Sequence, residues 1–179
     1  MLKWMFVAFF TALCVAAINR VAATSCADAS HGHEYLSLDD GKCYILFKQN
    51  ASWKDAMTLC GHLVHGRLAY VEEKTTLYAI YGWLSGIYKP IPSGNPASWW
   101  IGLLQVNTTS EPAGGWAWVN NDHSVNHWST PTNTPWRAGE PNNHGGEENC
   151  GSLLNKLGAF GFNDAPCAFS VPFVCESAA

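Results

Sequence analysis

The sequence predicts a single α+β domain that is held together by disulfide bonds. Three observations support this prediction. Six cysteines lie beyond the N-terminal leader, helical patterns occupy the first half of the chain, and short aromatic runs occupy the second half. A length of 179 residues suits one domain, and a hydrophobic fraction of 47% is enough to build a sizeable core. Helices early and strands late in the chain are typical of the α+β class.

The N-terminus has the pattern of a secretion signal. Lys3 precedes the apolar run WMFVAFFTALCVAA, and the small residues of VAATS follow it. We therefore assign residues 1–24 to a signal peptide and residues 25–179 to the domain. The apolar run is shorter than the roughly 20 residues that a membrane-spanning helix needs. The sequence thus favours a secreted, extracellular protein without membrane insertion.

The cysteine count predicts three disulfide bonds. Cys14 lies in the leader, which leaves an even set of six cysteines in an oxidising compartment. These six allow many connectivities, and the residues alone do not choose among them. None forms a Cys-x-x-Cys motif, which disfavours a zinc site. In the same compartment, two Asn-x-Ser/Thr sequons make Asn50 and Asn107 candidates for glycosylation.

The first half of the domain predicts a hairpin followed by two helices. In EYLSLDDGKCYILF, Asp40-Gly41 is a turn signal between two runs of alternating apolar residues. Ser52 is expected to cap a helix that ends at Gly66 in the manner of a C′ glycine. A second amphipathic helix is expected from about Glu72 to Gly86. The expected buried face of the first helix consists of Trp53, Ala56, Met57, Cys60 and Leu63.

The second half predicts short strands around a long loop. SWWIGLL, GWAWV, AFGF and PFVCE are rich in the residues that strands favour. Between GWAWV and AFGF lies a long stretch rich in Asn, Gly, Pro and Thr, and a loop of that size in a compact domain is usually functional. It contains GEPNNHGGEENC (139–150), which places three carboxylates and three Asn amides together. By itself, this stretch is either a solvated loop or a set of oxygen ligands for an ion.

A series of short motifs runs through the domain in a fixed order: Cys60, WIGL (100–103), WAWV (116–119), EPN (140–142), EENC (147–150), FND (162–164), Cys167 and FVCE (173–176). In their order and spacing, these motifs resemble the C-type lectin family. The likeness extends from about Cys26 to Glu176, which is essentially the whole mature chain. It implies the C-type lectin-like fold in its long form, with two helices, small antiparallel sheets and a long calcium-binding loop. It also implies the disulfide pairs Cys26–Cys43, Cys60–Cys175 and Cys150–Cys167.

The resemblance also implies a calcium site that is built from two segments. Calcium takes roughly 6–8 oxygen ligands, which carboxylates and amide carbonyls supply. The family ligand near the cysteine lies two residues before it, which selects Glu148 over Glu147. The family has a cis bond between the Glu and the Pro of its motif, which an X-Pro bond permits at small cost. The expected metal ligands are Glu140, Asn142, Glu148, Asn163 and Asp164, and all of these except Asp164 are expected to bind the sugar as well.

The implied function is calcium-dependent sugar binding outside the cell. The order Glu-Pro-Asn resembles the mannose-type signature, which suits the equatorial 3- and 4-hydroxyls of mannose, glucose or N-acetylglucosamine. Such glycans occur on microbial surfaces, and secreted relatives of this kind often act in innate immunity. One monosaccharide buries few atoms, so binding is expected to be weak unless several sites act together, as in a homo-oligomer.

Other functions are disfavoured or stay open. The formal net charge is −4, and loss of Lys3 and Arg20 with the leader makes the chain more acidic, which argues against nucleic acid as a partner. Neither HExxH nor GxSxG occurs, so an enzyme is not expected. The main alternative is a lectin-like domain that binds a protein or another non-sugar ligand without calcium. A structural matrix module also stays open.

Overall fold

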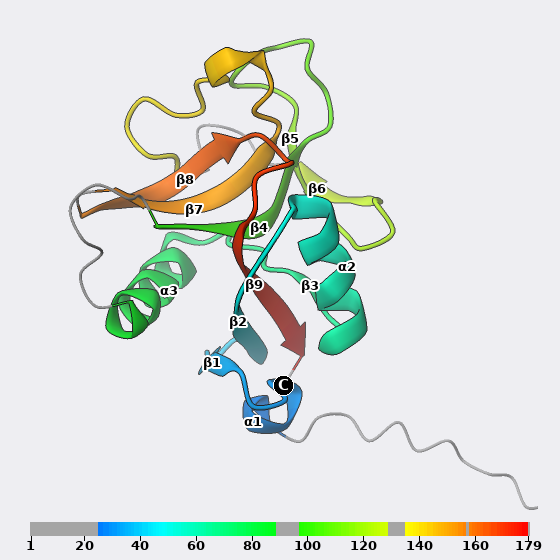
Figure 1. Ribbon diagram of the computed structural model, residues 1–179, viewed down its shortest axis with the longest axis vertical. Helices are drawn as coiled ribbons and strands as arrows, with labels where there is room; N and C mark the ends of the chain where they lie inside the picture. Colours follow the sequence, from blue (N-terminus) through cyan, green and yellow to red (C-terminus); the bar gives the residue numbers. More distant parts are fainter. Residues whose placement is uncertain (1–24, 89–96, 129–134, 157, 179) are drawn as a thin grey trace, which may run out of the picture.

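Figure 1 shows the computed structural model of the chain, which describes residues 25–88, 97–128, 135–156 and 158–178. Within these ranges it contains the helices α1 (Cys26–Ala29), α2 (Trp53–Leu63) and α3 (Lys74–Ile87) and a 3-10 turn, η1 (His144–Gly146). The sequence predicts only the two longer helices, because α1 has too few residues to show an amphipathic period. The expected signal peptide, residues 1–24, lies outside the described residues. No described helix is long and apolar enough to cross a membrane.

The strands join into one sheet, and the α+β class is confirmed. Its order is β1-β2-β9-β4-β5-β6, with β3 beside β9 and the β7–β8 hairpin attached to β4. The pairs are antiparallel except for one parallel contact between β4 and β9, which joins what the sequence predicts as separate small sheets. The strands are β1 (Glu34–Ser37), β2 (Lys42–Ala51), β3 (Arg67–Leu68), β4 (Ala97–Gln105), β5 (Trp116–Val119), β6 (Val125–Trp128), β7 (Cys150–Lys156), β8 (Ala159–Ala165) and β9 (Val171–Ala178).

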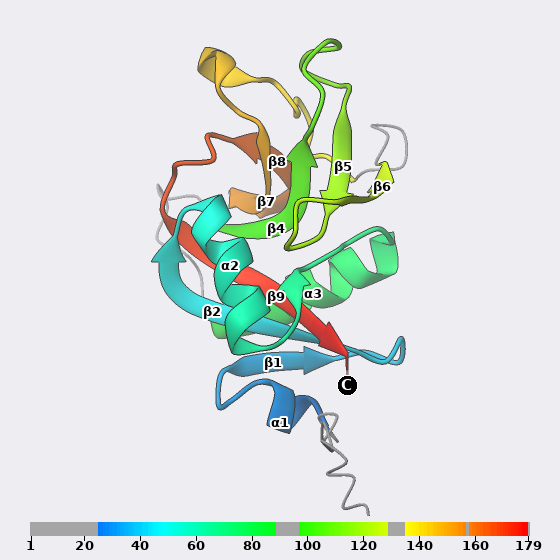
Figure 2. The same cartoon turned by 90° about the vertical axis from the view of Figure 1, so that its right-hand side faces the viewer.

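Helices α2 and α3 pack on opposite faces of this sheet (Figure 2). Ile45 of β2 and Trp100 of β4 belong to the core cluster that contains α2. Their chain neighbours Leu46 and Trp99 belong to the cluster that contains α3. Successive side chains of a strand point to opposite faces, so both strands bury side chains on two sides. The aromatic runs that predict strands therefore supply two cores rather than one.

Local signals predict the start of the fold correctly. The Asp40-Gly41 turn connects β1 to β2, and Gly41 has a positive φ of 73° that glycine adopts without steric cost. The Ser52 hydroxyl accepts a hydrogen bond from the Asp55 N–H at 3.2 Å, which is the expected N-terminal cap of α2. Both features depend on residues that are close in sequence, which is why the sequence is sufficient to find them.

The predicted end of α2 is wrong in detail. The helix stops at Leu63, and His65 rather than Gly66 takes the left-handed conformation, with φ of 50°. Gly66 has another role, because a Cβ built on it would lie 1.9 Å from the carbonyl oxygen of Glu176. Leu63, expected on the buried face, is 41% exposed because the helix ends there. Helix α3 begins at Lys74, two residues after the expected start at Glu72.

The three disulfides connect the cysteines that the family resemblance implies. Cys26–Cys43 links α1 to β2, and Cys60–Cys175 links α2 to β9 across 115 residues. Cys150–Cys167 links the start of β7 to the segment after β8. Closing loops of these lengths stabilises the folded state by roughly 3–5 kcal/mol each in the chain-entropy view. The last of the three fixes the end of the β7–β8 hairpin, where the candidate site lies.

Because the chain at the start of β3 lies so close to β9, a side chain at position 66 is expected to destabilise the domain. Gly66→Ala is expected to lower the free energy of unfolding by roughly 1–3 kcal/mol, because the backbone has to shift to admit the methyl group. Gly82→Ala in α3 is the matched control, since no described atom lies within 4 Å of an added Cβ there. That control is expected to stabilise by up to about 1 kcal/mol. Chemical denaturation followed by tryptophan fluorescence measures both, and equal stability of the two variants would contradict the packing.

Candidate functional site

The long loop before β7 is attached to β8 by backbone hydrogen bonds and aromatic packing. Arg137 donates its N–H to the Phe162 carbonyl at 2.9 Å, and Phe162 donates to the Pro135 carbonyl at 3.0 Å. The ring of Trp136 contacts Phe162 edge-on at 6.0 Å and Trp116 at 4.9 Å between centroids. Phe162 is fully buried, so it is the aromatic anchor at the position where the family has a tryptophan. These contacts hold residues 135–137, which directly precede the EPN segment, against β8.

Asp164 holds the middle of the loop. Its side chain has no solvent-exposed surface, and both carboxylate oxygens accept hydrogen bonds from the loop backbone. The N–H of Asn142 lies 3.1 and 3.0 Å from the two oxygens, and the N–H of Asn143 lies 2.7 Å from one of them. A buried carboxylate is stable only when such donors compensate its lost hydration. The residue predicted as a metal ligand therefore also fixes the loop that carries Glu140, Asn142 and Glu148.

Glu148 closes the other side of the loop. Asn143 takes a left-handed conformation, with φ of 46°, and its side-chain oxygen accepts the Glu148 N–H at 3.0 Å. The Glu148 carboxylate in turn accepts the His144 N–H at 2.7 Å. Burial raises the pKa of Glu148 above its ordinary value; the His144 N–H opposes this, and the negative charges of Asp164 and Glu140 add to it. The anionic groups therefore lie close enough to repel one another.

Glu140 is paired on both of its oxygens. Its side chain is 7% exposed, and one oxygen lies 3.2 Å from an Nη of Arg137. The other oxygen accepts a hydrogen bond from the side-chain amide of Asn142. The Glu140–Pro141 bond is cis. The EPN residues thus satisfy one another in the absence of a ligand.

Arg137 belongs to the site although the sequence motifs do not predict it. Its guanidinium is 17% exposed and forms the ion pair with Glu140, so it adds a positive charge beside the predicted ligands. A signal for it exists, because it is the single Lys or Arg between Lys89 and Lys156 and it precedes the first acid of the loop by three residues. A lone cation so close to an acidic loop can be expected to pair with one of its carboxylates.

The remaining predicted residues occupy the edges of this network. Asn163 lies beside Asp164 on β8, is partly buried, and donates its amide to the Asp164 backbone carbonyl. Glu147 is exposed, in keeping with its assignment as a bystander. The two sequon residues, Asn50 on β2 and Asn107 after β4, are both exposed to solvent, and their glycosylation stays a prediction.

Comparison with known proteins gives the family. The model of the lectin C-type domain matches residues 49–177, which is more than half of the chain. The chain belongs to the C-type lectin domain family. A similar relative is a C-type lectin of the lectoxin group from Thrasops jacksonii, which is 32% identical over 80% of this chain and 81% of its own length. The C-type lectin BfL-2 of Bungarus fasciatus is 31% identical over 76% of this chain and 77% of its own length.

Solved structures share the fold. The C-type lectin domain of murine dendritic cell inhibitory receptor 2, solved in complex with an N-glycan, matches with a TM-score of 0.56 at 23% identity. That match covers 81% of this chain and 96% of the receptor domain. The carbohydrate-recognition domain of cow CD23, solved with a GlcNAc2Man3 oligosaccharide, has a TM-score of 0.56 and 26% identity. It covers 81% of this chain and 93% of the CD23 chain. The C-type lectin-like fold predicted from the sequence is therefore confirmed.

The family commonly binds calcium, and the donor set of this C-type lectin domain suits such an ion. Glu140, Asn142, Glu148, Asn163 and Asp164 offer only oxygen donors of the kind that calcium prefers, without sulfur or imidazole. However, no three His, Cys, Asp or Glu side chains of the described residues are gathered as a metal cluster. The reason is that the carboxylates are turned to internal donors. The chemistry of the residues fits calcium, and the five-residue ligand set stays a prediction.

The role of Asp164 in the C-type lectin domain can be tested without any ligand. Asp164→Asn keeps the size of the side chain but replaces one acceptor oxygen by an NH2 group that faces the loop N–H donors. We expect this change to weaken the hold on the loop by roughly 1–3 kcal/mol. Hydrogen–deuterium exchange in EDTA should then be faster at the Asn142 and Asn143 amides. Glu147→Gln, at an exposed position, is the control, and unchanged exchange in Asp164→Asn would contradict the anchoring role.

Proposed function

We propose that this C-type lectin domain is a calcium-dependent receptor for mannose-type sugars. The observation that carries the proposal is the Asp164 anchor, which brings the loop residues 140–148 and the end of β8 together. Side chains from two segments can then face one ion, with Glu140, Asn142, Glu148, Asn163 and Asp164 as its ligands. When bound, calcium supplies a positive charge that polarises two neighbouring sugar hydroxyls and holds them in place.

The charge of the site supports a divalent ion. The three carboxylates of Glu140, Glu148 and Asp164 lie around one loop, and Arg137 compensates one of their charges. Two negative charges are left, which is the charge that one calcium ion neutralises. The raised pKa of Glu148 has the same origin in part, because Asp164 and Glu140 disfavour its ionised form. A cation bound between these groups relieves the repulsion.

The pairing of Glu140 with Asn142 supports sugar binding at the same residues. A carboxylate accepts hydrogen bonds and an amide NH2 donates them. A sugar hydroxyl needs both, since it can donate its proton to Glu140 and accept a hydrogen bond from Asn142. When a sugar binds, the hydrogen bond between Glu140 and Asn142 is therefore replaced by two hydrogen bonds, one between each of these side chains and the sugar hydroxyl. Glu148 and Asn163 offer a second acceptor and donor for the neighbouring hydroxyl.

The wider setting of the proposal is extracellular. Residues 1–24 act as a signal peptide, and the mature domain is secreted and recognises mannose, glucose or N-acetylglucosamine on glycans, including those of microbial surfaces in innate immunity. The alternative, a lectin-like domain that binds another ligand without calcium, also has an observation in its favour. The carboxylates already find internal partners, so they do not require an ion to be stable.

A pair of neighbouring acids tests the proposal. The protein is expected to be retained on mannose–agarose with calcium and released by EDTA. Glu148→Ala is expected to abolish retention, because it removes a ligand and an acceptor from the site. Glu147→Ala is the matched control and is expected to leave retention unchanged, since Glu147 is exposed. Column retention and calcium titration by calorimetry measure the effect.

Two results would contradict the proposal in different ways. Retention that persists in EDTA would favour the calcium-independent alternative. Loss of calcium binding in Glu147→Ala but not in Glu148→Ala would mean that the neighbouring acid is the ligand. Thermal unfolding of both variants in EDTA checks that neither result comes from a loss of the folded state.

The order of donor and acceptor in the EPN motif predicts the preferred sugar. The double change Glu140→Gln and Asn142→Asp exchanges the acceptor and the donor along the loop. We expect it to shift preference from mannose towards galactose by roughly tenfold or more, because two hydrogen bonds lose their matched polarity. Competition by free mannose and free galactose for a bound neoglycoprotein measures the ratio. An unchanged ratio with calcium binding intact would refute the assigned hydrogen-bond roles.

A further inference from the structure

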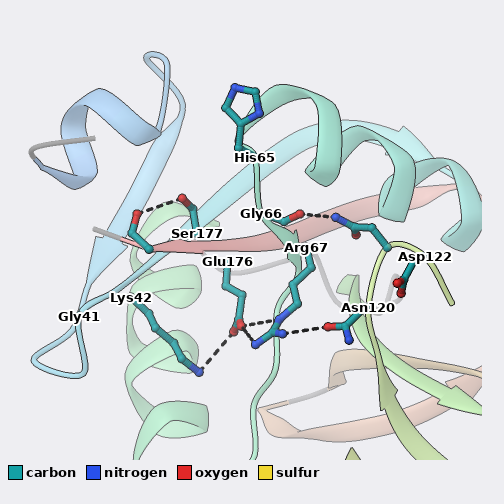
Figure 3. A pocket seen from close by; sticks show the side chains of 11 residues that line it. Gly41, Lys42, His65, Gly66, Arg67, Asn120, Asp122, Glu176 and Ser177 are labelled. Atoms are coloured by element: carbon teal, nitrogen blue, oxygen red, sulfur yellow. Dashed lines mark hydrogen bonds and ion pairs between the residues drawn. The ribbon is translucent and has the colours of Figure 1, made fainter. Parts of the chain in front are cut away.

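A second polar pocket lies away from the loop site. It is formed by the start of β2, the end of β9, residues 65–67 at the start of β3 and the turn between β5 and β6, and it has a volume of about 550 Å³ (Figure 3). That volume suits a ligand of monosaccharide size. The pocket shares no residue with the EPN segment or with the end of β8. Figures 1 and 2 place η1 and the C-terminal end of β9 at opposite ends of the domain.

A saturated carboxylate lies at the centre of this pocket. Glu176 is 4% exposed; one of its oxygens accepts a hydrogen bond from Nε of Arg67 at 2.8 Å and forms an ion pair with Nη2 of the same guanidinium at 2.7 Å. The other oxygen accepts the backbone N–H of Tyr70 at 2.9 Å. Arg67 also stacks on the Tyr70 ring, 3.6 Å from its centroid. Glu176 therefore has little capacity left to accept a hydrogen bond from a ligand.

Lys42 gives the centre of the pocket an excess of positive charge. Its ammonium lies 3.7 Å from the nearer Glu176 oxygen, which is beyond the length of a good hydrogen bond. Two cations thus share one carboxylate that is already hydrogen-bonded to Arg67 and Tyr70. The side chain of Lys42 is 36% exposed, so its three N–H donors face a space that a ligand can enter.

The side-chain amide of Asn120 directs its oxygen towards Arg67 and its nitrogen away from the centre of the pocket. The side-chain oxygen of Asn120 accepts hydrogen bonds from Arg67 Nη1 and from the Tyr70 hydroxyl, each at 3.0 Å. Burial raises the pKa of Tyr70 to about 12, although the charge of Arg67 opposes this, so its hydroxyl stays a donor at neutral pH. The Asn120 amide nitrogen is left to face away and donates to the Ser124 hydroxyl at 2.9 Å. Asn120 therefore helps to fix Arg67 in place at the centre of the pocket.

The lining holds a second carboxylate, Asp122, which makes its formal charge neutral as a whole and confines the positive excess to the centre. Asp122 lies on the exposed turn between β5 and β6, and one oxygen accepts hydrogen bonds from the N–H and hydroxyl of Ser124. These hydrogen bonds lower the pKa of Asp122. Its charge is surrounded by water and is screened, whereas the charges of Lys42 and Arg67 act next to a buried group.

We propose that this pocket is a second, calcium-independent site for an acidic sugar, that is, a sugar-sized ring that carries a carboxylate or a sulfate. The anionic group binds between the ammonium of Lys42 and the guanidinium of Arg67. The ring hydroxyls contact the amides and hydroxyls at the pocket wall. This proposal does not depend on sugar binding at the EPN segment, because the two sites share neither residues nor a metal.

The test uses 15N-labelled full-length mature protein in EDTA, so that no calcium-dependent site contributes. Glucuronate supplies the carboxylate, glucose 6-sulfate supplies the sulfate, and glucose is the neutral control. We expect one or both acidic sugars to shift the amide signals of Lys42, Arg67 and Ser177 at millimolar concentration, while glucose does not. The acidic sugar that gives the larger shift identifies the anionic group that the pocket prefers.

Two lysine variants decide whether the pocket is responsible. Lys42→Gln is expected to weaken binding roughly tenfold, because a charge-assisted contact is lost while Arg67 still pairs with Glu176. Lys48→Gln is the matched control on the same strand, since Lys48 is 54% exposed and lies 3.4 Å from Glu34. Lys42→Arg is expected to restore binding. The proposal is overturned if neither acidic sugar shifts these signals, if glucose shifts them equally, or if both Gln variants weaken binding to the same degree.

Discussion

The buried carboxylate of Asp164 is the interaction on which the candidate site depends. It lies in β8, and its two oxygens accept the backbone N–H groups of Asn142 and Asn143. The register of β7 with β8 and the Cys150–Cys167 disulfide fix the place of Asp164. Because a buried charge without donors is costly, the loop adopts the course that brings these N–H groups to it. A long polar segment without regular structure thereby gains one conformation.

The carboxylate oxygens of the candidate site accept hydrogen bonds within the domain, and in our proposal the same oxygens bind an ion and a sugar. Glu140 is satisfied by Arg137 and Asn142, and Glu148 is satisfied by the His144 N–H. These internal bonds stabilise the domain without an ion, while the remaining negative charge favours one. In our proposal, an ion and a sugar replace bonds that already have the correct donors and acceptors. The change needs side-chain movement, and the loop backbone keeps its anchor.

The sequence predicts well what depends on neighbours in the chain. The Ser52 cap and the turn at Gly41 each follow from a few adjacent residues. The sequence does not predict features that depend on backbone segments far away in the chain. Gly66 is a glycine because β9 passes beside it, and a C′ position is only the local interpretation of the same residue. Likewise, the ligand candidates come from a motif, whereas Arg137 becomes part of the site only through its contact with Glu140.

The overall charge of the protein is a poor guide to its individual surfaces. The formal net charge of −4 argues against a polyanion as a partner for the whole domain. It says little about a single pocket, because the field at short range is set by the nearest groups and by burial. At one end of the sheet, three carboxylates outnumber one arginine. At the other end, Lys42 and Arg67 share Glu176. In our two proposals, the first end attracts a cation and the second attracts an anionic sugar, and a packed core separates the two sites.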